Sequence, residues 1–372
     1  MKSYHFLFLC CSLLGFSCSN NSKTKRAEQP SEKDFAVIAY YSGNGQNLEQ
    51  YRWDKMTHVI YSFCHLEGQK LAVDDAKDSL TIRNLVALKE EHPQLKVLLS
   101  LGGWGGCKTC SAVFAEEEGR QVFAQSVKDL MKEYNADGLD LDWEYPGIEG
   151  YPGHQYLAED KANFTDLVKK LRQTMGEEAV LSFAAGGFQK YFDHSIEWEK
   201  VMPVVDYVNL MSYDLVGGYS KVTGHHTSLF STKEQARSGD QGIQALLELG
   251  VPAKKIVIGA AFYARTWENV ENINQGLYQS GTFKSFVPHR IFEQRINKEN
   301  GFVFYRDSIA QAPYAYSAQL QEFATFDDPV SIRKKTEYAM EEGLGGIMFW
   351  QLTNDQEDGE LLRAIWEKVD ND

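Results

Sequence analysis

Short runs of apolar, β-branched and aromatic residues recur along the chain, and segments with helical periodicity separate most of them. Gly, Pro or Asp bounds each run, as is typical of buried β-strands. Because the runs are almost continuously apolar, we expect a parallel sheet that is covered on both faces. The pattern predicts eight strands, at residues 36–41, 57–64, 96–104, 137–145, 180–188, 205–214, 255–265 and 343–352.

Amphipathic segments between these runs predict the helices. After the fourth run, four apolar residues follow the i, i+3, i+4, i+7 spacing of one helix face: Phe164, Leu167, Val168 and Leu171. A similar face lies within residues 122–131. Asp328 followed by Pro329 is a typical helix start and predicts a helix through Met340. Alternating strands and helices indicate an α/β fold, and eight strands indicate a (β/α)8 TIM barrel.

The spacing of the runs indicates an insertion. The gap between the seventh and eighth runs is about twice the typical gap, and residues 266–322 hold alternating polar and aromatic runs. Residues 35–265 and 323–369 together make about 280 residues, close to the size of a barrel of this kind. We therefore predict a catalytic TIM barrel with a small α+β insertion domain between strands 7 and 8.

The N-terminal segment differs from the rest of the chain. One Lys precedes an apolar run at residues 6–16, which is too short to span a bilayer and is typical of a secretory signal. Ser17 before Cys18 is similar to a bacterial lipoprotein cleavage site, with Cys18 as the lipidated residue. We predict a signal peptide at 1–18, a flexible tether at 19–34, and a secreted protein anchored in the bacterial cell envelope, periplasmic or at the surface. Cleaved secretion without a lipid is the alternative.

The net charge limits the classes of binding partner, and the cysteines bear on disulfides and metal sites. The 38 Lys and Arg against 52 Asp and Glu give a formal net charge of −14, which argues against nucleic acid or an anionic membrane surface as the main partner. Cys107 and Cys110 are expected to close a small disulfide loop or to remain free, and Cys64 is expected to be a buried thiol. No second paired cysteine motif accompanies them, so the sequence predicts no metal site.

The fourth strand carries the candidate chemistry. Asp140, Asp142 and Glu144 occupy alternate positions, so in an extended strand all three face one side. The carboxyl end of a barrel strand is where active sites lie. If the three acids face the lumen, burial and mutual repulsion raise the pKa of at least one, and a raised Glu144 at the outer end suits a general acid.

Two other interpretations of these acids were weighed. In the first, the acids face the helices or solvent, which would bring the intervening apolar residues into the lumen. In the second, the carboxylates bind Mg²⁺ or Ca²⁺, but same-face residues on one strand do not easily surround an ion and no His is close in sequence. We therefore expect no metal and no cofactor.

The segment DGLDLDWEYP at 137–146 resembles the DxxDxDxE signature of the family 18 glycoside hydrolases, the chitinase family. Further segments resemble motifs of the same family in the same order: LSLGGW at 99–104, MSYD at 211–214, FYAR at 262–265 and GGIMFW at 345–350. The insertion, with AQAPYAY at 310–316, is similar to the lobe of the deep-cleft chitinase subfamily. The resemblance extends over nearly the whole mature chain and implies the barrel with an insertion predicted above.

The resemblance implies catalytic roles. Glu144 would protonate the glycosidic oxygen and later deprotonate the attacking water, while the substrate's own acetamido oxygen attacks the anomeric carbon. Asp142 would hold the acetamido N–H, and Asp140 below it would share its proton. Tyr213 would donate a hydrogen bond to the acetamido oxygen. The implied substrate-binding residues are Asp214, Trp350 as the floor under the sugar, Trp104, Met211, Tyr263 and Arg265.

Several further residues were considered for the cleft. Trp53 and Trp267 join Trp104 as candidates because sugar faces stack on aromatic rings, although a Trp at a strand end packs as often as it binds. His225 and His226 are interpreted as cleft-loop residues rather than metal ligands. Asp137 has the wrong parity for the lumen and is interpreted as structural.

The resemblance implies an enzyme that cleaves β-1,4 linkages of chitin or chitooligosaccharides with retention, and we expect it to be a monomer. One alternative is an endo-β-N-acetylglucosaminidase acting on N-glycans, an activity that usually goes with a barrel lacking the lobe. Another is a non-catalytic chitin-binding lectin, which generally lacks the acid found here at Glu144. A structural envelope lipoprotein is a further alternative, which a polar lumen would disfavour.

Overall fold

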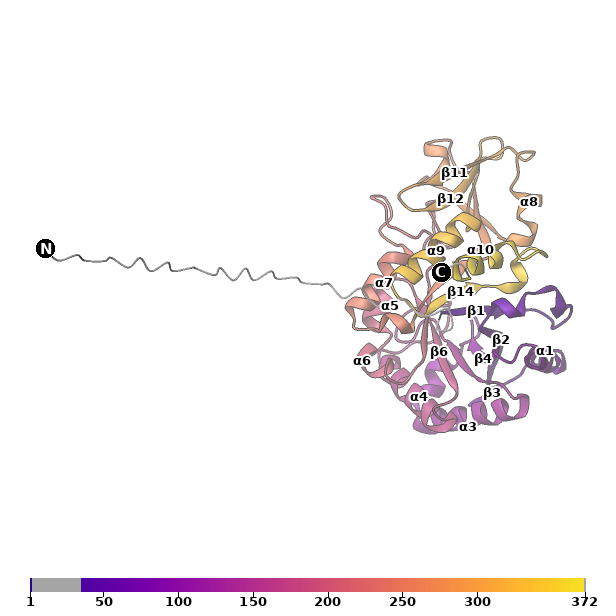
Figure 1. The fold of residues 1–372 in the computed structure, drawn as a ribbon, viewed down its shortest axis with the longest axis vertical. Coiled ribbons are helices and arrows are strands. Elements are labelled where there is room, and N and C mark those ends of the chain that lie inside the picture. Colours follow the sequence, from indigo (N-terminus) through magenta and orange to yellow (C-terminus); the bar gives the residue numbers. More distant parts are fainter. Residues whose placement is uncertain (2–34, 371–372) are drawn as a thin grey trace.

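The computed structural model describes residue 1 and residues 35–370, so the predicted signal peptide, tether and lipidated Cys18 lie outside the described residues. Parallel strands close into a barrel, because β1 pairs with both the last and the second strand (Figure 1). The predicted TIM barrel is therefore confirmed. Its strands are β1 (Ala36–Tyr41), β2 (His58–Glu67), β4 (Lys96–Gly102), β5 (Gly138–Asp142), β6 (Val180–Gly186), β7 (Tyr207–Met211), β8 (Ile256–Ala261) and β14 (Gly346–Trp350).

Helices cover the outside of the barrel. The main ones are α1 (Ala76–Ala87), α2 (Cys110–Ala115), α3 (Glu117–Tyr134), α4 (Asp160–Met175), α5 (Gln189–His194), α6 (Trp198–Val201), α7 (Gly239–Glu248), α9 (Pro329–Glu341) and α10 (Glu360–Val369). The helical patterns at 122–131 and 164–171 fall within α3 and α4. Asp328 caps α9, where its side chain accepts from the backbone N–H groups of Val330 and Ser331, as its sequence predicts.

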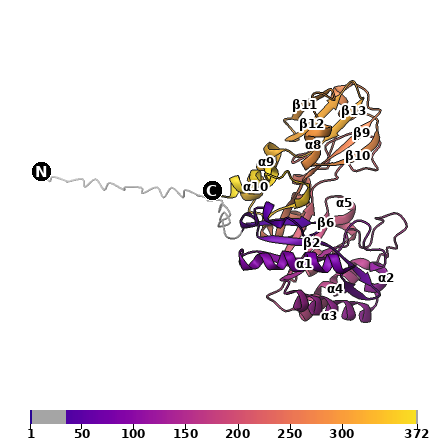
Figure 2. The same ribbon diagram turned by 90° about the vertical axis from the view of Figure 1, so that its right-hand side faces the viewer.

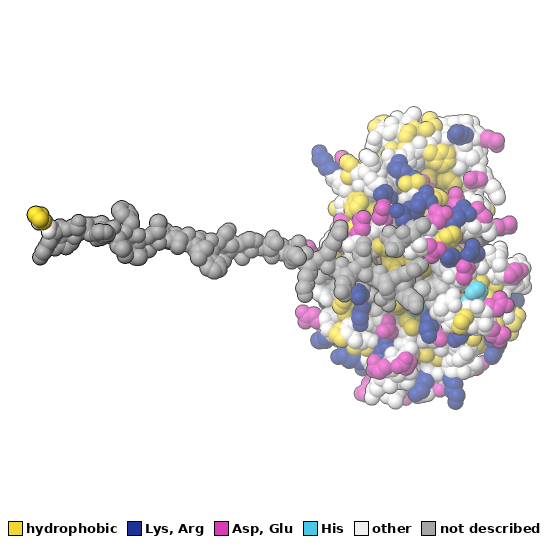
Figure 3. All heavy atoms as spheres, viewed as in Figure 1, with side chains coloured by type: hydrophobic (Ala, Val, Ile, Leu, Met, Phe, Trp, Pro, Cys, Tyr) yellow, Lys and Arg dark blue, Asp and Glu magenta, His cyan; other side chains and the backbone are white. Residues whose placement is uncertain are grey.

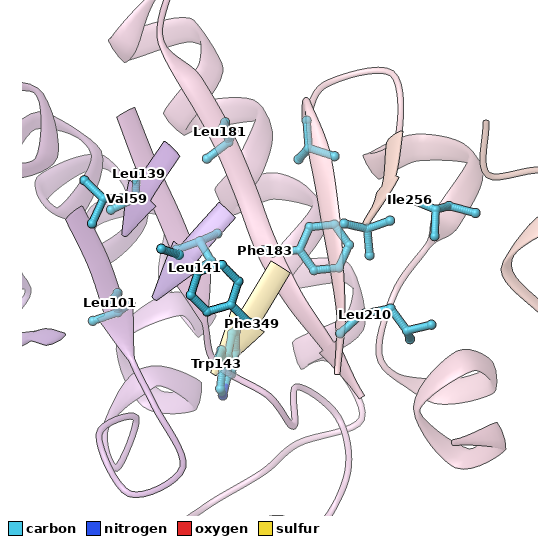
Figure 4. Packing of buried hydrophobic residues seen from close by; sticks show 14 of the residues in the cluster. Val59, Leu101, Leu139, Leu141, Trp143, Leu181, Phe183, Leu210, Ile256 and Phe349 are labelled. Atoms are coloured by element: carbon cyan, nitrogen blue, oxygen red, sulfur yellow. The ribbon is translucent and has the colours of Figure 1, made fainter. Parts of the chain in front are cut away.

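Alternate residues of each barrel strand face two different environments. Leu139, Leu141 and Trp143 belong to the apolar core between the strands and the helices (Figure 4). Residues of the opposite parity fill the lumen, where Ile38, Tyr40 and Met348 pack together. The interpretation in which the acids of β5 face the helices is therefore wrong, because apolar side chains of the other parity already occupy that face.

A second, antiparallel sheet forms the lobe, which lies beside α9 and α10 above one end of the barrel (Figure 2). Its strands follow the order β10 (Thr282–Pro288), β9 (Tyr263–Glu268), β13 (Glu322–Thr325), β12 (Ala312–Ser317) and β11 (Phe302–Asp307). The short helix α8 (Phe292–Arg295) lies between β10 and β11. The expectation of one strand over 255–265 is wrong: β8 ends at Ala261, and Tyr263 begins β9, which pairs with β10 and β13. No Gly, Pro or Asp separates Ala261 from Tyr263, so the sequence pattern does not mark the change of sheet.

Two smaller features complete the fold. Cys107 and Cys110 form a disulfide just after β4, and Cys64 is free and buried. The short strand β3 (Lys70–Ala72) forms a hairpin with the end of β2.

Acidic and basic side chains are interspersed on the face seen in Figure 3. In the described part of the chain, no helix combines the length and the hydropathy needed to cross a membrane.

Candidate active site

A cavity of about 720 Å³ opens at the carboxyl end of the barrel strands. Loops after β4, β5, β6 and β7 line it together with side chains of the lobe. Nine of the sequence-predicted site residues line this cavity: Trp104, Asp142, Glu144, Met211, Tyr213, Asp214, Tyr263, Arg265 and Trp350. Trp104 and Trp350, which are 246 positions apart in the sequence, therefore meet in one place, as the barrel topology requires.

Asp140 lies beneath the cavity and is fully buried. Its carboxylate accepts hydrogen bonds from four side chains: Tyr40 at 3.2 Å, Ser100 at 2.9 Å, Ser182 at 2.6 Å and Asn209 at 3.2 Å. Burial raises the pKa of Asp140, while these hydrogen bonds oppose the rise. Within the described residues no hydrogen bond joins Asp140 to Asp142, so the proton shared by the two stays a prediction.

Asp142 is the last residue of β5 and lies at the cavity wall. Burial raises its pKa well above the usual value, and electrostatic interaction with the carboxyl groups of Glu144 and Asp140 raises it further. One of its oxygens, Oδ1, is buried without a hydrogen-bond partner among the described residues. A buried acceptor of this kind is costly unless a ligand supplies the donor. Asp142 is thus a vacant acceptor in the cavity.

Glu144 follows the end of β5 by two residues. The sequence places it in one extended column with Asp140 and Asp142, and this is wrong for Glu144: pairing with β4 stops at Asp142, and Glu144 has a left-handed backbone with φ of 59°. Its carboxyl still lines the cavity. Burial, and then the charge of Asp214, raise the pKa of Glu144 to about 8. Glu144 therefore holds a proton at neutral pH.

Asp214 faces Glu144 from the end of β7 and is held by residues of the lobe. Arg265 donates two hydrogen bonds to the two oxygens of Asp214, and the Tyr263 hydroxyl donates a third at 2.8 Å. Burial alone would raise the pKa of Asp214, but the hydrogen bonds of Arg265 and His226 bring it well below its usual range. Asp214 therefore stays ionised and supplies a fixed negative charge to the cavity.

Tyr213 supplies a hydroxyl to the same cavity. Burial raises its pKa well above the usual value, and the charges of Asp142 and Asp214 add to the rise. The hydroxyl thus keeps its proton, and its partner in the structure is the Met348 thioether at 3.8 Å, a weak acceptor. A stronger acceptor on a ligand would therefore take this hydrogen bond.

Aromatic rings supply flat apolar surfaces. Trp350, at the end of β14, stacks on Phe63 with ring centroids 5.6 Å apart and planes 15° apart. Trp104 is 42% exposed, and its neighbours Tyr145 and Tyr151 contact its ring edge-on. The faces of Trp350 and Trp104 line the cavity, and sugar rings pack on surfaces of this type.

Other sequence expectations for the cleft are wrong. Trp53 and Trp267 are buried and do not line this cavity; the indole N–H of Trp53 donates to the Leu48 carbonyl and that of Trp267 to the Ser220 carbonyl. These two rings pack rather than bind, the outcome that an aromatic residue next to a strand leaves open. The expectation of His225 and His226 as cleft-loop residues is also wrong.

Both histidines are fully buried behind the cavity wall. His225 lies 3.2 Å from Asp307 of the lobe, and His226 lies 3.5 Å from Asp214. Among the described residues, no cluster of three His, Cys, Asp or Glu side chains is arranged to hold a metal ion.

Sequence analysis missed several residues that line the cavity: Phe63, Tyr145, Phe188, Tyr219, Arg237, Phe283 and Phe286. Phe188 follows a barrel strand, and an aromatic residue at the carboxyl end of a strand is the signal that could have found it. Arg237 and Tyr219 lie in a long loop, where the sequence carries no periodicity from which to place a side chain.

Comparisons with known proteins agree with this geometry. Residues 36–355 match the family described as glycosyl hydrolases family 18. Chitinase A1 of Niallia circulans is 36% identical over 300 residues, which cover 74% of this chain but only 43% of that protein. A family 18 N-acetylglucosaminidase structure from Paenibacillus barengoltzii is 36% identical with a TM-score of 0.80, covering 90% of this chain and 99% of that one.

A group IV chitinase of Ostrinia furnacalis, solved in complex with allosamidin, is 27% identical with a TM-score of 0.81, covering 91% of this chain and 99% of that one. The family match spans most of the chain, and it includes the barrel strands and the acids at their carboxyl end. This chain is therefore a member of family 18 of the glycosyl hydrolases.

Proposed function

We propose that this protein hydrolyses β-1,4 bonds between N-acetylglucosamine units of chitin or chitooligosaccharides. The observation that carries the proposal is a protonated Glu144, with its pKa raised to about 8, in the same cavity as the vacant acceptor of Asp142. A general acid near neutral pH needs such a raised pKa. Similarity to proteins named chitinases supports the choice of substrate.

In the proposed reaction, Glu144 donates its proton to the glycosidic oxygen as the bond between that oxygen and the anomeric carbon breaks. The acetamido oxygen of the same sugar attacks the anomeric carbon and forms a cyclic oxazolinium ion. Glu144, now ionised, then takes a proton from a water molecule that opens this ring. Two displacements at one carbon give retention of configuration.

Asp142 and Tyr213 would position the acetamido group. Asp142 Oδ1, which lacks a hydrogen-bond partner within the described residues, accepts the acetamido N–H, and the Tyr213 hydroxyl donates to the acetamido oxygen. The positive charge of the ring favours the ionised form of Asp142, and this carboxylate then stabilises the ring electrostatically. Asp140, held by its four donors, supports Asp142 from below, and Trp350 supplies the apolar floor.

The test is product analysis on chitohexaose with wild type and the Glu144→Gln variant. The variant keeps the shape of the side chain but loses the proton donor, so we expect hydrolysis to fall by at least about 100-fold while oligosaccharide binding remains. Glu133→Gln, on the exposed surface of α3, is the matched control. Unchanged turnover by Glu144→Gln would refute the role of Glu144.

A second candidate is an N-acetylglucosaminidase that removes single sugars from a chain end. The similarity to the Paenibacillus barengoltzii structure, which the chain covers almost completely, favours it. The same experiment separates the two, because this activity releases only monosaccharide from the start, whereas a chitinase releases longer oligomers. A glycoprotein tested in parallel would reveal an endo-β-N-acetylglucosaminidase.

We also propose that the protein is a monomeric secreted lipoprotein of the bacterial envelope, attached through Cys18. The lipoprotein-like sequence around Cys18 supports this, as does the Cys107–Cys110 disulfide, which fits an oxidising compartment. Labelled palmitate should be incorporated into wild type but not into Cys18→Ala. Light scattering during gel filtration tests the monomer, and a dimer mass would contradict it.

A further inference from the structure

Arg237 is a cation on the cavity wall that the proposed reaction does not use. It lies in the loop between β7 and α7, and its guanidinium carbon is 5.0 Å from the centre of the Phe188 ring. One of its N–H groups donates to the Leu215 carbonyl at 3.3 Å. Both Phe188 and Leu215 also line the cavity. The guanidinium is therefore held at a defined place along the cleft.

Arg237 differs from Arg265, the other arginine of the cavity. Arg265 is paired with Asp214, whereas no ion pair involves Arg237 within the described residues. A guanidinium has five N–H groups, and Leu215 accepts from one of them. The remaining donors of Arg237 are thus available to a ligand in the cavity.

The barrel topology places the strand before Arg237 across the cleft from the strands of Tyr40 and Phe63. Phe188 follows β6 and Arg237 follows β7, while Tyr40 and Phe63 belong to β1 and β2, on the opposite side of the closed barrel. All four residues line one cavity. A sugar chain in this cavity with one unit on Trp350 can therefore place a neighbouring unit beside Arg237 and Phe188.

The chemistry of a guanidinium decides which sugar can lie there. It is always charged, donates hydrogen bonds and accepts none. An acetamido oxygen or a hydroxyl satisfies it, whereas the ammonium group of glucosamine is repelled and offers only donors. Glu149 and the reacting carboxylates attract an ammonium group elsewhere in the cavity, so the rejection is confined to the neighbourhood of Arg237.

We propose that Arg237 is a specificity-determining residue that makes the sugar-binding position beside Arg237 and Phe188 select N-acetylglucosamine and reject glucosamine. The inference rests on the proposed function. It assigns to this position a preference for acetylated chitin over its deacetylated form, chitosan.

The experiment compares wild type, Arg237→Gln and Arg237→Lys on fully acetylated chitohexaose and on partially deacetylated chitosan oligomers, at a pH at which the free amines are protonated. The proposed reaction already excludes glucosamine from the sugar whose acetamido group attacks, so the informative position is the one beside Arg237. For wild type we expect glucosamine to be missing there too, in products sequenced by mass spectrometry. In Arg237→Gln, the ratio of kcat/KM for acetylated over deacetylated substrate should fall by about tenfold, and glucosamine should enter that position.

Arg237→Lys keeps the charge but loses the planar donors. It should still exclude glucosamine, while its kcat/KM on chitohexaose falls. Arg83→Gln, on α1 outside the cavity and paired with Glu133, is the matched control and should keep the wild-type ratio.

The inference is overturned if Arg237→Gln keeps the wild-type ratio and the wild-type product sequences, or if wild type accepts glucosamine at the position beside Arg237. Failure of the proposed function has a different signature, because wild type would then leave chitohexaose uncut. Normal cleavage of chitohexaose by all variants with an unchanged ratio therefore rejects the role of Arg237 alone.

Discussion

The charge of Asp214 is expected to move the alkaline limit of activity to higher pH through its effect on the pKa of Glu144. Burial and the Asp214 carboxylate together raise the pKa of Glu144 from 4.5 to about 8, with burial as the larger cause. Replacing Asp214 with Asn removes the smaller contribution, so we expect the pKa of Glu144 to fall by about one, equivalent to about 1.4 kcal/mol. It should remain well above 4.5 because the burial remains.

The sign follows from the role of the proton. Glu144 acts as an acid only while it is protonated, so activity is lost as the pH rises through its pKa. The assay is the pH dependence of kcat/KM on a chitooligosaccharide, which reports the free enzyme. The alkaline limb should lie near pH 8 in wild type and near pH 7 in Asp214→Asn.

A paired variant separates charge from damage to the site. Arg265→Gln removes the cation that neutralises Asp214, so the field at Glu144 becomes more negative and the alkaline limb should move to higher pH. Loss of structure would lower activity in both variants without opposite movements of the limb. An alkaline limb that stays in place in Asp214→Asn would refute the reasoning.

Three other perturbations have defined outcomes. Lys335→Met should lower the free energy of unfolding in urea by about 3–5 kcal/mol, because Lys335 and Asp327 form a fully buried ion pair at 2.6 Å and the carboxylate would lose its partner; a loss below about 1 kcal/mol would contradict this. Asp328→Ala removes the cap of α9 and should cost about 1 kcal/mol, seen as a lower Tm. Ser182→Ala deletes the 2.6 Å hydrogen bond to Asp140, and the loss of this bond raises the pKa of the Asp140 carboxyl. The acid limb of kcat/KM should therefore move to higher pH.

The strand periodicity of the sequence was enough to place Asp140 and Asp142. Alternation along β5 puts apolar residues on one face and acids on the other, and the structure has this arrangement. Glu144 follows a different rule, because its left-handed backbone is a local conformation that alternation does not encode. The chemistry of the site could therefore be predicted, but not how its outermost acid is held.

The contacts across the cleft depend on distant parts of the chain. Asp214 and Arg265 are 51 residues apart and meet because β7 and β8 are neighbours. Each residue can be placed near a strand end from the sequence. Their ion pair, however, requires the chain to leave the barrel after Ala261, and no Gly, Pro or Asp marks this change of sheet. Trp53 likewise shows no sequence sign of facing the core rather than the cleft.

The junction between the barrel and the lobe has a mechanical consequence. Only Phe262 separates β8 from β9; it is stacked on Phe349 at 4.2 Å, and its backbone bonds both to Trp350 and to His289. Tyr263 and Arg265 thus hydrogen-bond to Asp214 from a segment that is fixed to the barrel. This wall of the cavity has no flexible connection about which it could move as a lid. A chimaera that carries the lobe of a relative would have to keep this one-residue connection at Phe262, because a shift in register there would separate Arg265 from Asp214.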